Sequence, residues 1–245
     1  MRSLVIPQPG ESLMSIAKRC DALYICPKEG GVRKGPLVPY AGKDAQGRNL
    51  VGDIYFNFRK IERHPMAVEA FAMAAAKKLG SLIDTFDTVC GIPNGGRSFG
   101  MPFARITGKQ SVYPEKEAIP TAPRKKQEYG WNLSQFEFGP GERVAVAEDV
   151  CNNFQNTDST LDLVAKTGAE VTLLVCALNR SPTYEMNYTP KKGLLAGKRL
   201  PIIASIREAY PEYTQDHPAV AADMAADNIE WEAKKNWARL CAFMQ

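Results

Sequence analysis

The sequence predicts an α/β protein built on a parallel sheet, because short apolar runs alternate with segments of helical period. The runs cover 85–90, 143–147 and 171–178, and turn-forming residues bound each of them. Between the last two runs, Leu161 and Val164 lie on one face of a predicted helix that ends at a glycine. Strands that alternate with helices form parallel sheets, in which ligands bind beyond the carboxyl ends of the strands. We therefore expect a sheet flanked by helices, with a functional site at that edge.

Changes in composition divide the chain into three predicted parts. Residues 1–63 carry many glycines and prolines between short apolar stretches, which is typical of the turns and short strands of a small accessory subdomain, or hood. A segment dense in alanine and methionine predicts a helix over 66–79, stopped by Gly80, near the start of an α/β core at 64–210. Residues 211–245 repeat apolar side chains on one helical stripe, which predicts a helical extension that packs on the core or on a partner subunit.

Charge and cysteine content exclude several classes of protein. A formal net charge of +4 over 245 residues, without long basic clusters, gives no support for nucleic-acid binding. The six cysteines contain no C-x-x-C pair and both histidines precede prolines, so a zinc site is not expected. Free thiols, together with the lack of a signal-peptide pattern or a membrane-spanning apolar run, predict a cytoplasmic protein without a membrane partner.

The first candidate site is a glycine-rich segment, 90–98, that directly follows the first predicted strand. Glycines allow backbone N–H groups to approach an anion, and the start of a following helix adds a favourable dipole. The spacing from Gly91 onward also matches a phosphate-binding P-loop, except that Arg97 stands where lysine belongs. Because Pro102 predicts that the helix begins near residue 101, the P-loop interpretation is the less favoured one. The structural alternative is a glycine-rich turn that binds nothing.

The second candidate site lies at the end of the next strand, where Glu148 and Asp149 are adjacent. Neighbours on an extended chain point to opposite sides, so at most one of them is expected to serve a given ligand unless the strand has already ended. A polar loop and the hydroxyl-rich first turn of a helix follow, over 151–160. Carboxylates beside such a helix start are suited to hold a sugar diol and a phosphate, directly or through Mg²⁺. The alternative is that these residues only turn the chain and cap the helix.

The order of these features resembles the type I phosphoribosyltransferase family, and in particular its orotate phosphoribosyltransferases, over most of residues 35–208. Segment 87–96 is similar to the pyrophosphate loop of that family, and segment 144–157 to its signature strand and loop for phosphoribosyl pyrophosphate. Weaker similarities follow the same order: Tyr55-Phe56-Asn57 to the aromatic stretch near the base, 124–130 to the catalytic loop, and Asn179-Arg180 to a pair whose arginine contacts the orotate carboxylate.

The resemblance implies transfer of a phosphoribosyl group from phosphoribosyl pyrophosphate to a planar, pyrimidine-like base, with orotate as first candidate and pyrophosphate as product. It also implies Mg²⁺ held mainly by the substrate, and a homodimer. It assigns catalytic roles to Glu148, Asp149, Arg124, Lys125 and Lys126. It assigns 5′-phosphate binding to Asn152, Asn153, Gln155, Asn156 and Thr157, pyrophosphate binding to Gly91, Ile92, Pro93, Asn94, Gly95 and Arg97, and base binding to Tyr55, Phe56 and Arg180.

Each of the weaker similarities has a structural alternative. Residues 124–126 are equally consistent with a solvated basic loop within 113–141, a segment without steady period that predicts a long loop or ribbon. Arg180 is almost as consistent with a surface arginine at a strand end. Because neighbours in a strand alternate, one ring of Tyr55 and Phe56 is expected in the core.

Departures from the family pattern keep other functions open. The family's 5′-phosphate loop contains a glycine, whereas 152–156 contain none, and we expect that Phe154 cannot replace glycine at positive φ. The lysine before Gly130 is displaced, so Lys125 or Lys126 has to substitute, and Tyr40 stands where a base-contacting lysine is usual. These departures favour, as an alternative, a catalytically impaired protein of the same fold that binds a nucleotide or phosphate. A P-loop-like NTPase is a distant third.

Overall fold

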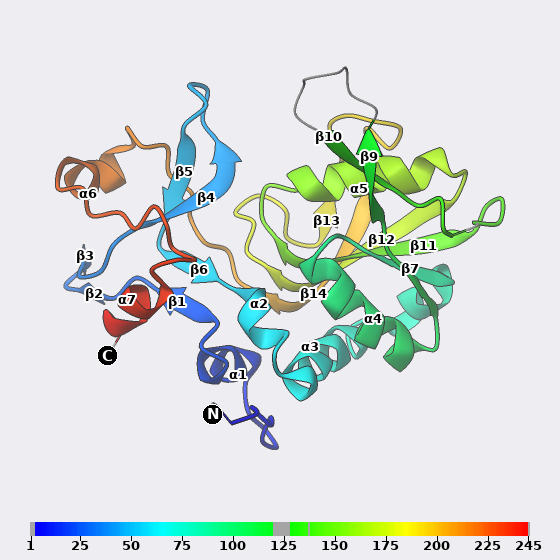
Figure 1. The fold of residues 1–245 in the computed structure, drawn as a ribbon, viewed down its shortest axis with the longest axis horizontal. Coiled ribbons are helices and arrows are strands. Elements are labelled where there is room, and N and C mark those ends of the chain that lie inside the picture. Colours follow the sequence, from blue (N-terminus) through cyan, green and yellow to red (C-terminus); the bar gives the residue numbers. More distant parts are fainter. Residues whose placement is uncertain (1–2, 120–127, 137, 245) are drawn as a thin grey trace. The chain divides into compact units, whose positions relative to one another are not determined.

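The computed structural model describes residues 3–119, 128–136 and 138–244, and only the backbone of 118, 119, 128, 129, 155 and 156 (Figure 1). Contacts divide the chain into two units. The hood unit combines Met1–Ala67, Arg180–Thr183 and Glu208–Gln245, and the core unit combines Val68–Asn179 and Tyr184–Arg207. Both the expected accessory subdomain and the expected C-terminal extension therefore contribute to the hood unit. In the described part of the chain, no helix is both long and apolar enough to cross a membrane.

A six-stranded sheet in the order β13-β14-β12-β11-β7-β8 forms the centre of the core unit. Its strands are β7 (Thr88–Gly91), β8 (Gln110–Val112), β11 (Arg143–Cys151), β12 (Glu170–Asn179), β13 (Asn187–Tyr188) and β14 (Leu200–Arg207). All neighbouring strands pair in parallel except β13, which is antiparallel at one edge. The predicted parallel sheet is confirmed, and the three predicted strands correspond to β7, β11 and β12.

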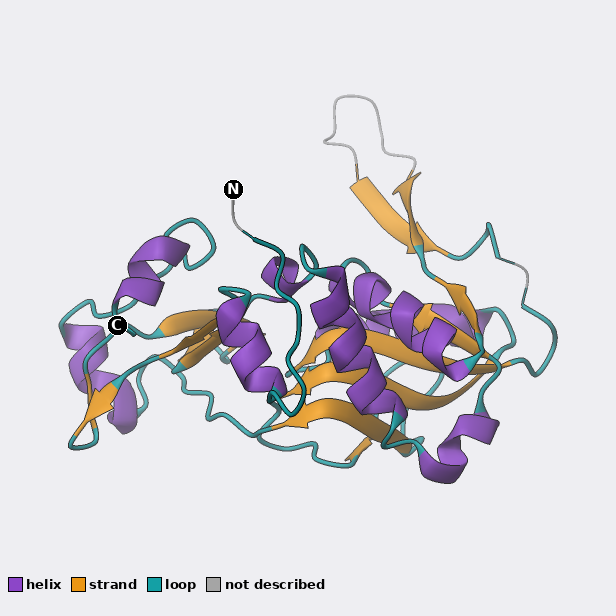
Figure 2. Ribbon diagram, turned by 90° about the horizontal axis from the view of Figure 1, so that it is seen from below, coloured by secondary structure: helices purple, strands orange, loops and turns teal. Residues whose placement is uncertain are grey.

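Helices flank both faces of this sheet, with α5 (Gln155–Lys166) on one face and α3 (Pro65–Ala76) and α4 (Gly95–Thr107) on the other (Figures 1 and 2). On the α5 side, Leu161 and Val164 are buried in the same cluster as Val144 and Val146 of β11. The alternate residues of β11 are alanines, and this small-residue face lies towards α4, where Gly100 packs beside Ala147. The alternation of large and small side chains along β11 thus determines how closely each helix approaches.

The predicted helix at 66–79 is α3, which begins at Pro65. Proline is tolerated there, because an N–H group in the first helical turn would have no partner within the helix. A 3-10 turn, η1 (Gly80–Thr85), follows α3. Lys78 Nζ donates hydrogen bonds to the carbonyl oxygens of Ala204 and Ser205, both at 2.8 Å. The hydroxyl of Ser205 donates in turn to the carbonyl of Phe71 at 2.7 Å, so the end of this helix is fixed to β14.

The start of α4 differs from the prediction. The helix begins at Gly95 rather than near residue 101, and Pro102 lies inside it. A proline at this position removes one helical hydrogen bond. The glycines of the first turn explain why the helix still forms, because a Cβ added at Gly96 would lie 2.3 Å from the carbonyl oxygen of Ala147. Close packing on β11 therefore allows the helix to begin earlier in the chain than the local sequence predicts.

Residues 113–141, expected to form a loop or ribbon, contain the antiparallel ribbon β9 (Glu115–Ile119) and β10 (Glu128–Asn132). The tip at 120–127 lies outside the described residues. None of the six cysteines, all of which lie in the described residues, forms a disulfide bond, and five of them are buried, as expected. Burial raises the pKa of the Cys90 thiol to about 12, which keeps it protonated and unreactive at neutral pH.

The hood unit consists of short strands in antiparallel pairs and short helices, as its glycine and proline content predicts. The pairs are β1 (Leu23–Ile25) with β6 (Ile54–Phe56), β2 (Lys28–Glu29) with β3 (Val32–Arg33), and β4 (Val38–Lys43) with β5 (Asn49–Gly52). The helices are α1 (Leu13–Arg19), α2 (Phe58–Ile61), α6 (Ala221–Ala225) and α7 (Trp237–Ala242), with the 3-10 turn η2 (Pro218–Val220) before α6. The C-terminal segment forms shorter helices than its long apolar stripe predicts.

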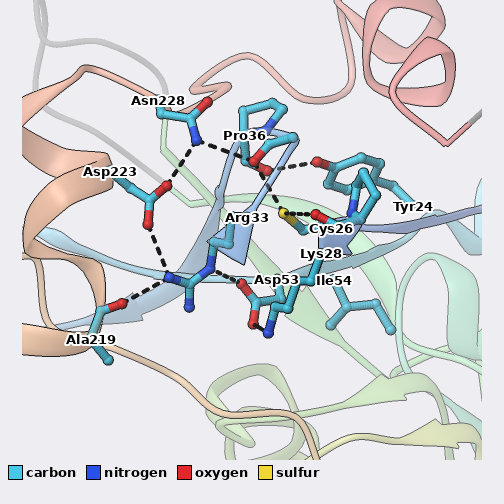
Figure 3. Close-up of polar contacts among 12 residues, drawn as sticks. Tyr24, Cys26, Lys28, Arg33, Pro36, Asp53, Ile54, Ala219, Asp223 and Asn228 are labelled. Carbon is cyan, nitrogen blue, oxygen red and sulfur yellow. Dashed lines mark hydrogen bonds and ion pairs between the residues drawn. The ribbon is translucent and has the colours of Figure 1, made fainter. Parts of the chain in front are cut away.

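An ion-pair network around the buried Asp53 joins the N-terminal and C-terminal segments of the hood unit (Figure 3). The carboxylate of Asp53 accepts hydrogen bonds from Arg33 Nε at 2.5 Å and Lys28 Nζ at 2.7 Å. Arg33 Nη1 also donates to Asp223 at 2.9 Å and to the carbonyl of Ala219 at 2.8 Å. Burial disfavours the charged form of Asp53, but the hydrogen bonds from the two cations outweigh it and lower its pKa. The network therefore links β3 to the turn before α6 and to α6 itself.

Replacing Asp53 by asparagine is expected to reduce the free energy of unfolding by about 3 kcal/mol, because it removes the buried carboxylate that pairs with both Arg33 and Lys28. The wild-type stabilisation is present above the unfolded-state pKa of Asp53 and is lost as pH falls through its lowered folded-state pKa. The Asp53→Asn variant, in contrast, lacks this pH-dependent contribution to stability. Urea unfolding at several pH values measures both effects. Glu29→Gln, which removes an exposed ion pair with Lys34, is the matched control and should change stability by less than about 1 kcal/mol.

Candidate functional site

The carboxyl ends of β7 and β11 lie side by side, with Gly91 paired to Ala147. The backbone N–H of Ile92 donates to the carbonyl of Ala147 at 2.8 Å, and three residues, 92–94, then connect β7 to α4. A Cβ added at Gly95 would lie 2.1 Å from Asp149 Oδ2. The absence of a side chain at Gly95 is therefore what allows the start of α4 to lie directly against the acidic strand end. The two candidate sites from the sequence form one site.

The two acids of β11 have different environments. Glu148 is buried, whereas Asp149 is half-buried and its carboxylate lies beside Gly95. Burial, and then the neighbouring charge of Asp149, raise the pKa of Glu148 well above its usual value. The backbone N–H of Asp149 donates to Glu148 Oε1 at 3.1 Å, and that of Val150 donates to Asp149 Oδ1 at 2.9 Å. The site thus combines a buried carboxyl that holds its proton to unusually high pH with a more accessible carboxylate at the loop.

Phe154 occupies the left-handed region of backbone space, with φ 59° and ψ 15°, as the N-cap residue of α5. The expectation that phenylalanine cannot take a positive φ here is therefore wrong. Its buried ring stacks on Tyr188, with centroids 4.1 Å apart and planes at 10°, and meets Tyr184 edge-on at 5.2 Å. A left-handed residue other than glycine costs about 1–2 kcal/mol. Burial of a ring of this size contributes about 1.5–3 kcal/mol, and aromatic pairing adds to it, so packing outweighs the backbone cost.

The residues predicted to bind a 5′-phosphate surround the N-terminus of α5. Asn152 and Asn153 are half-buried in the loop, Thr157 is buried in the first turn, and the backbones of Gln155 and Asn156 begin the helix. The first N–H groups of an α-helix have no intrahelical partner and carry the positive end of its dipole, which suits them to bind an anion. An acid, Asp158, also lies in this turn and accepts a hydrogen bond from the hydroxyl of Tyr188.

A surface hollow of about 360 Å³ lies next to the loop between β7 and α4. It is lined by Pro93, Asn94, Arg97, Tyr113, Pro114, Glu115, Lys116 and Trp131. The guanidinium of Arg97 lies 3.5 Å above the centre of the Tyr113 ring. Three predicted pyrophosphate-binding residues therefore line one hollow, together with side chains of the ribbon that sequence reasoning missed. The alternating charges of β9 were the available signal, but nothing in the sequence indicates which loop the ribbon faces.

In the hood unit, Arg180 is buried rather than on the surface. Its guanidinium lies 3.8 Å above the Tyr40 ring, and its Nη1 lies 3.9 Å from Glu212 Oε1. Burial lowers the pKa of Arg180, and the nearby tyrosine and glutamate oppose that effect. The surface-arginine alternative is therefore wrong. Sequence reasoning noted that Tyr40 replaces a lysine but did not anticipate that it would pack against this arginine.

The neighbouring aromatic residues of β6 diverge, as strand alternation predicts. Phe56 is buried and stacks on Phe58 with centroids 6.3 Å apart, whereas Tyr55 is half-buried with its ring 5.7 Å from that of Trp237. The basic triplet Arg124, Lys125 and Lys126 lies outside the described residues.

The donor set at the strand ends bears on the expected Mg²⁺. Across the described ranges, no group of three or more His, Cys, Asp and Glu side chains is arranged to hold a metal ion. The acidic pair offers carboxylate oxygens, which Mg²⁺ prefers, but too few to complete an octahedral shell. These residues fit an ion that takes most of its ligands from a bound diphosphate and from water.

Comparisons with known proteins identify the fold. No family model matches the chain. The solved structure of orotate phosphoribosyltransferase from Aeropyrum pernix superposes with a TM-score of 0.51 at 15% sequence identity, over 80% of this chain and 93% of that one. The fold is that of the type I phosphoribosyltransferases.

Sequence relatives agree with that fold. Proteins named orotate phosphoribosyltransferase from Nitratiruptor sp. and Phenylobacterium zucineum are 26% and 24% identical over 160 and 201 residues, which cover 65% and 82% of this chain and 71% and 89% of those proteins. An adenine phosphoribosyltransferase from Ruminiclostridium cellulolyticum is 29% identical over 116 residues, 44% of this chain and 68% of that protein. The sequence relatives of this chain thus include proteins named for different bases.

The geometry of the glycine-rich segment argues against a P-loop. The helix does run through Arg97 and Ser98, so the objection based on Pro102 is wrong. A P-loop, however, needs its glycine-rich residues in a loop whose N–H groups surround a phosphate. Here Gly95 and Gly96 already belong to α4 and pack against β11.

Replacing Phe154 by alanine or by glycine separates the two effects at this position. Both variants lose the ring, and we expect each to lower the free energy of unfolding by about 3–5 kcal/mol. Glycine adopts positive φ without strain, so Phe154→Gly should be the more stable of the two by roughly 0.5–1 kcal/mol. Urea unfolding of the two variants measures the difference. An alanine variant as stable as the glycine variant would contradict the left-handed conformation.

Proposed function

We propose that the protein transfers the phosphoribosyl group of phosphoribosyl pyrophosphate to a planar base and releases pyrophosphate. The observation that carries this proposal is the direct contact between the acidic end of β11 and the glycines that begin α4, next to the N-terminus of α5. One edge of the sheet then offers carboxylates for the ribose hydroxyls, helix N–H groups for the 5′-phosphate and Arg97 for the pyrophosphate. Relatives that are named phosphoribosyltransferases support the same activity.

In this reaction the bond between ribose C1 and the pyrophosphate oxygen breaks, and a bond between C1 and a base nitrogen forms. Positive charge develops at C1 while negative charge grows on the leaving group, so electrostatic stabilisation and positioning are the main tasks of the protein. Glu148 and Asp149 are proposed to bind the ribose hydroxyls and favour the positive charge. Mg²⁺, bound mainly through the diphosphate, would neutralise the leaving group. Arg124, Lys125 and Lys126 are proposed to cover the site and exclude water.

For the base, we propose a pyrimidine-like ring, with orotate as the first candidate. Relatives named orotate phosphoribosyltransferase and the burial of the cationic Arg180 support this choice. Arg180 would supply charge to an acidic substituent of the ring, and Tyr55 and Phe56 would help to bound its site. We further propose that the protein is cytoplasmic and forms a homodimer, and sedimentation of the purified protein would test the dimer.

The second candidate is a phosphoribosyltransferase-like protein that binds a nucleotide or phosphate without turnover. The specific observation in its favour is Asp158, whose negative charge lies in the first turn of the helix proposed to bind the 5′-phosphate. The bulky Phe154 in the same loop also favours this second candidate.

Release of pyrophosphate decides between the two candidates. The purified protein is incubated with Mg²⁺, phosphoribosyl pyrophosphate and, in turn, orotate, uracil, adenine, guanine and hypoxanthine. Release that depends on one base supports the enzyme and identifies its acceptor. Tight binding of a nucleoside monophosphate with no release for any base would instead support the binding protein.

The raised pKa of Glu148 predicts a pH dependence. At low pH its carboxyl is neutral and cannot stabilise the charge at C1, so kcat/KM for phosphoribosyl pyrophosphate should rise as pH increases through that raised pKa. Glu148→Gln imitates the neutral form, and we expect it to lose about 10²-fold in rate at high pH and to show no such rise. Glu170→Gln, which removes an exposed carboxylate, should keep the wild-type profile. A profile unchanged by Glu148→Gln would exclude this carboxyl as its origin.

A further inference from the structure

A second surface hollow, of about 650 Å³, lies wholly within the hood unit, and we call it the hood hollow. Its lining residues are 3–5, 19–21, 60, 63 and 64. They come from three separate segments: the residues before α1, the end of α1 with the turn after it, and α2 with the link to α3. Small-molecule sites commonly occupy roughly 300–1,000 Å³, so the hood hollow has the size of a ligand site. It shares no residue with the site at the ends of β7 and β11.

The charged side chains of the hood hollow are mostly cationic. Arg19, Lys60 and Arg63 line it together with a single carboxylate, that of Asp21, so the charged lining has a net charge of +2. A phosphate monoester carries about −1.5 to −2 charges at neutral pH. The charge of the lining therefore suits a small dianion better than a neutral or cationic ligand.

Two of these cations are held by neighbours within the hood unit. Arg19 Nη1 donates to Glu11 Oε2 at 2.6 Å. Lys60 Nζ pairs with Asp21 Oδ2 at 2.8 Å and lies 5.5 Å from the centre of the Trp237 ring. Both cations also belong to the last turns of helices, α1 and α2, where positive charge is favourable. Contacts inside the protein thus account for Arg19 and Lys60 without any ligand.

Arg63 has no such account. It follows α2, is exposed, and its guanidinium forms no ion pair or hydrogen bond within the described ranges. Its charge acts on His64, because burial and then this charge lower the pKa of the imidazole. The N–H of Val5 donates to His64 Nδ1 at 3.1 Å, so the neutral ring carries its own proton on Nε2. The hood hollow therefore combines an unpaired guanidinium with an adjacent imidazole donor.

We propose that the hood hollow binds a small phosphate monoester, with the phosphate at Arg63 and His64 and the uncharged part of the ligand against Leu4 and Val5. Leu4 keeps 52% of its surface exposed, so a ligand that covers it gains apolar burial in addition to the charge pairing. The proposal goes beyond phosphoribosyl transfer and does not depend on it.

The imidazole signals of the full chain test the proposal by nuclear magnetic resonance. The chain has two histidines, His64 and His217, and only His64 lines the hood hollow. Titration with inorganic phosphate or phenyl phosphate is expected to shift the His64 ring signals and to raise the pKa of His64, because a nearby negative charge favours the protonated ring. The signals of His217 should not move. His64→Gln identifies which signal belongs to which histidine.

Variants locate the bound phosphate. Loss of a charge-assisted hydrogen bond predicts that Arg63→Gln raises the dissociation constant for phenyl phosphate, read from the His64 signals, about 10- to 100-fold. Without ligand, the same variant should raise the pKa of His64, since the charge that lowers it is gone. Arg59→Gln is the matched control. This exposed arginine of α2 pairs with Glu62 and does not line the hood hollow, so the variant should bind as the wild type does.

The apolar part of the hood hollow has a test of its own. Phenyl phosphate should bind more tightly than inorganic phosphate, because its ring can cover Leu4. Leu4→Ser should remove that difference and leave the affinity for inorganic phosphate unchanged.

Three outcomes would overturn the proposal. They are His64 signals that neither probe moves, a dissociation constant that Arg63→Gln leaves unchanged, and equal affinity for phenyl phosphate and chloride, which would show a nonspecific response to anions. Each of these leaves phosphoribosyl transfer standing, because release of pyrophosphate tests residues at the strand ends. Conversely, a lack of turnover with every base would leave the hood hollow and its ligand unaffected.

Discussion

The close approach of α4 to the end of β11 is the contact on which the site depends. Gly95 leaves space for the Asp149 carboxylate and Gly96 leaves space for the carbonyl of Ala147. Any side chain at either position would push the helix away and separate the acidic pair from the loop that follows β7. The alanines of β11 serve the same contact, because their small side chains bring α4 close to the sheet. The site can therefore form only because Gly95 and Gly96 have no side chains.

At the neighbouring loop, the structure depends instead on a large side chain. Phe154 holds a left-handed conformation with a large side chain, stabilised by Tyr184 and Tyr188 from the segment between β12 and β14. Glycine would reach the same conformation without any partner. The aromatic cluster therefore couples the start of α5 to a distant part of the chain. The same tyrosine that stacks on Phe154 also holds Asp158, so packing and local charge at this helix start are set together.

The sequence predicted what depends on local pattern. The strands that became β7, β11 and β12, the helix α5 and the order of the two candidate sites all follow from periodicity and turn residues. It predicted wrongly where tertiary contacts overrule local preference, as at Pro102 inside α4 and at Phe154 with its positive φ. It could not indicate which face of the ribbon carries Lys116 towards Asn94, or that Tyr40 would pack against Arg180, because both contacts join residues far apart in the chain.

The composition of the hood unit affects the order in which the chain can fold. Arg33 can meet its partner Asp223 only after another 190 residues have been made, whereas 68–179 and 184–207 form the core unit from a nearly continuous stretch. During synthesis the core can collapse while the first 67 residues still lack the strand and helix partners that follow residue 208. Val51 and Leu37, which later pair with Tyr213 and Ile229, are apolar edges that stay open in that interval. The hood unit can therefore be completed only after the residues of the core unit have been made.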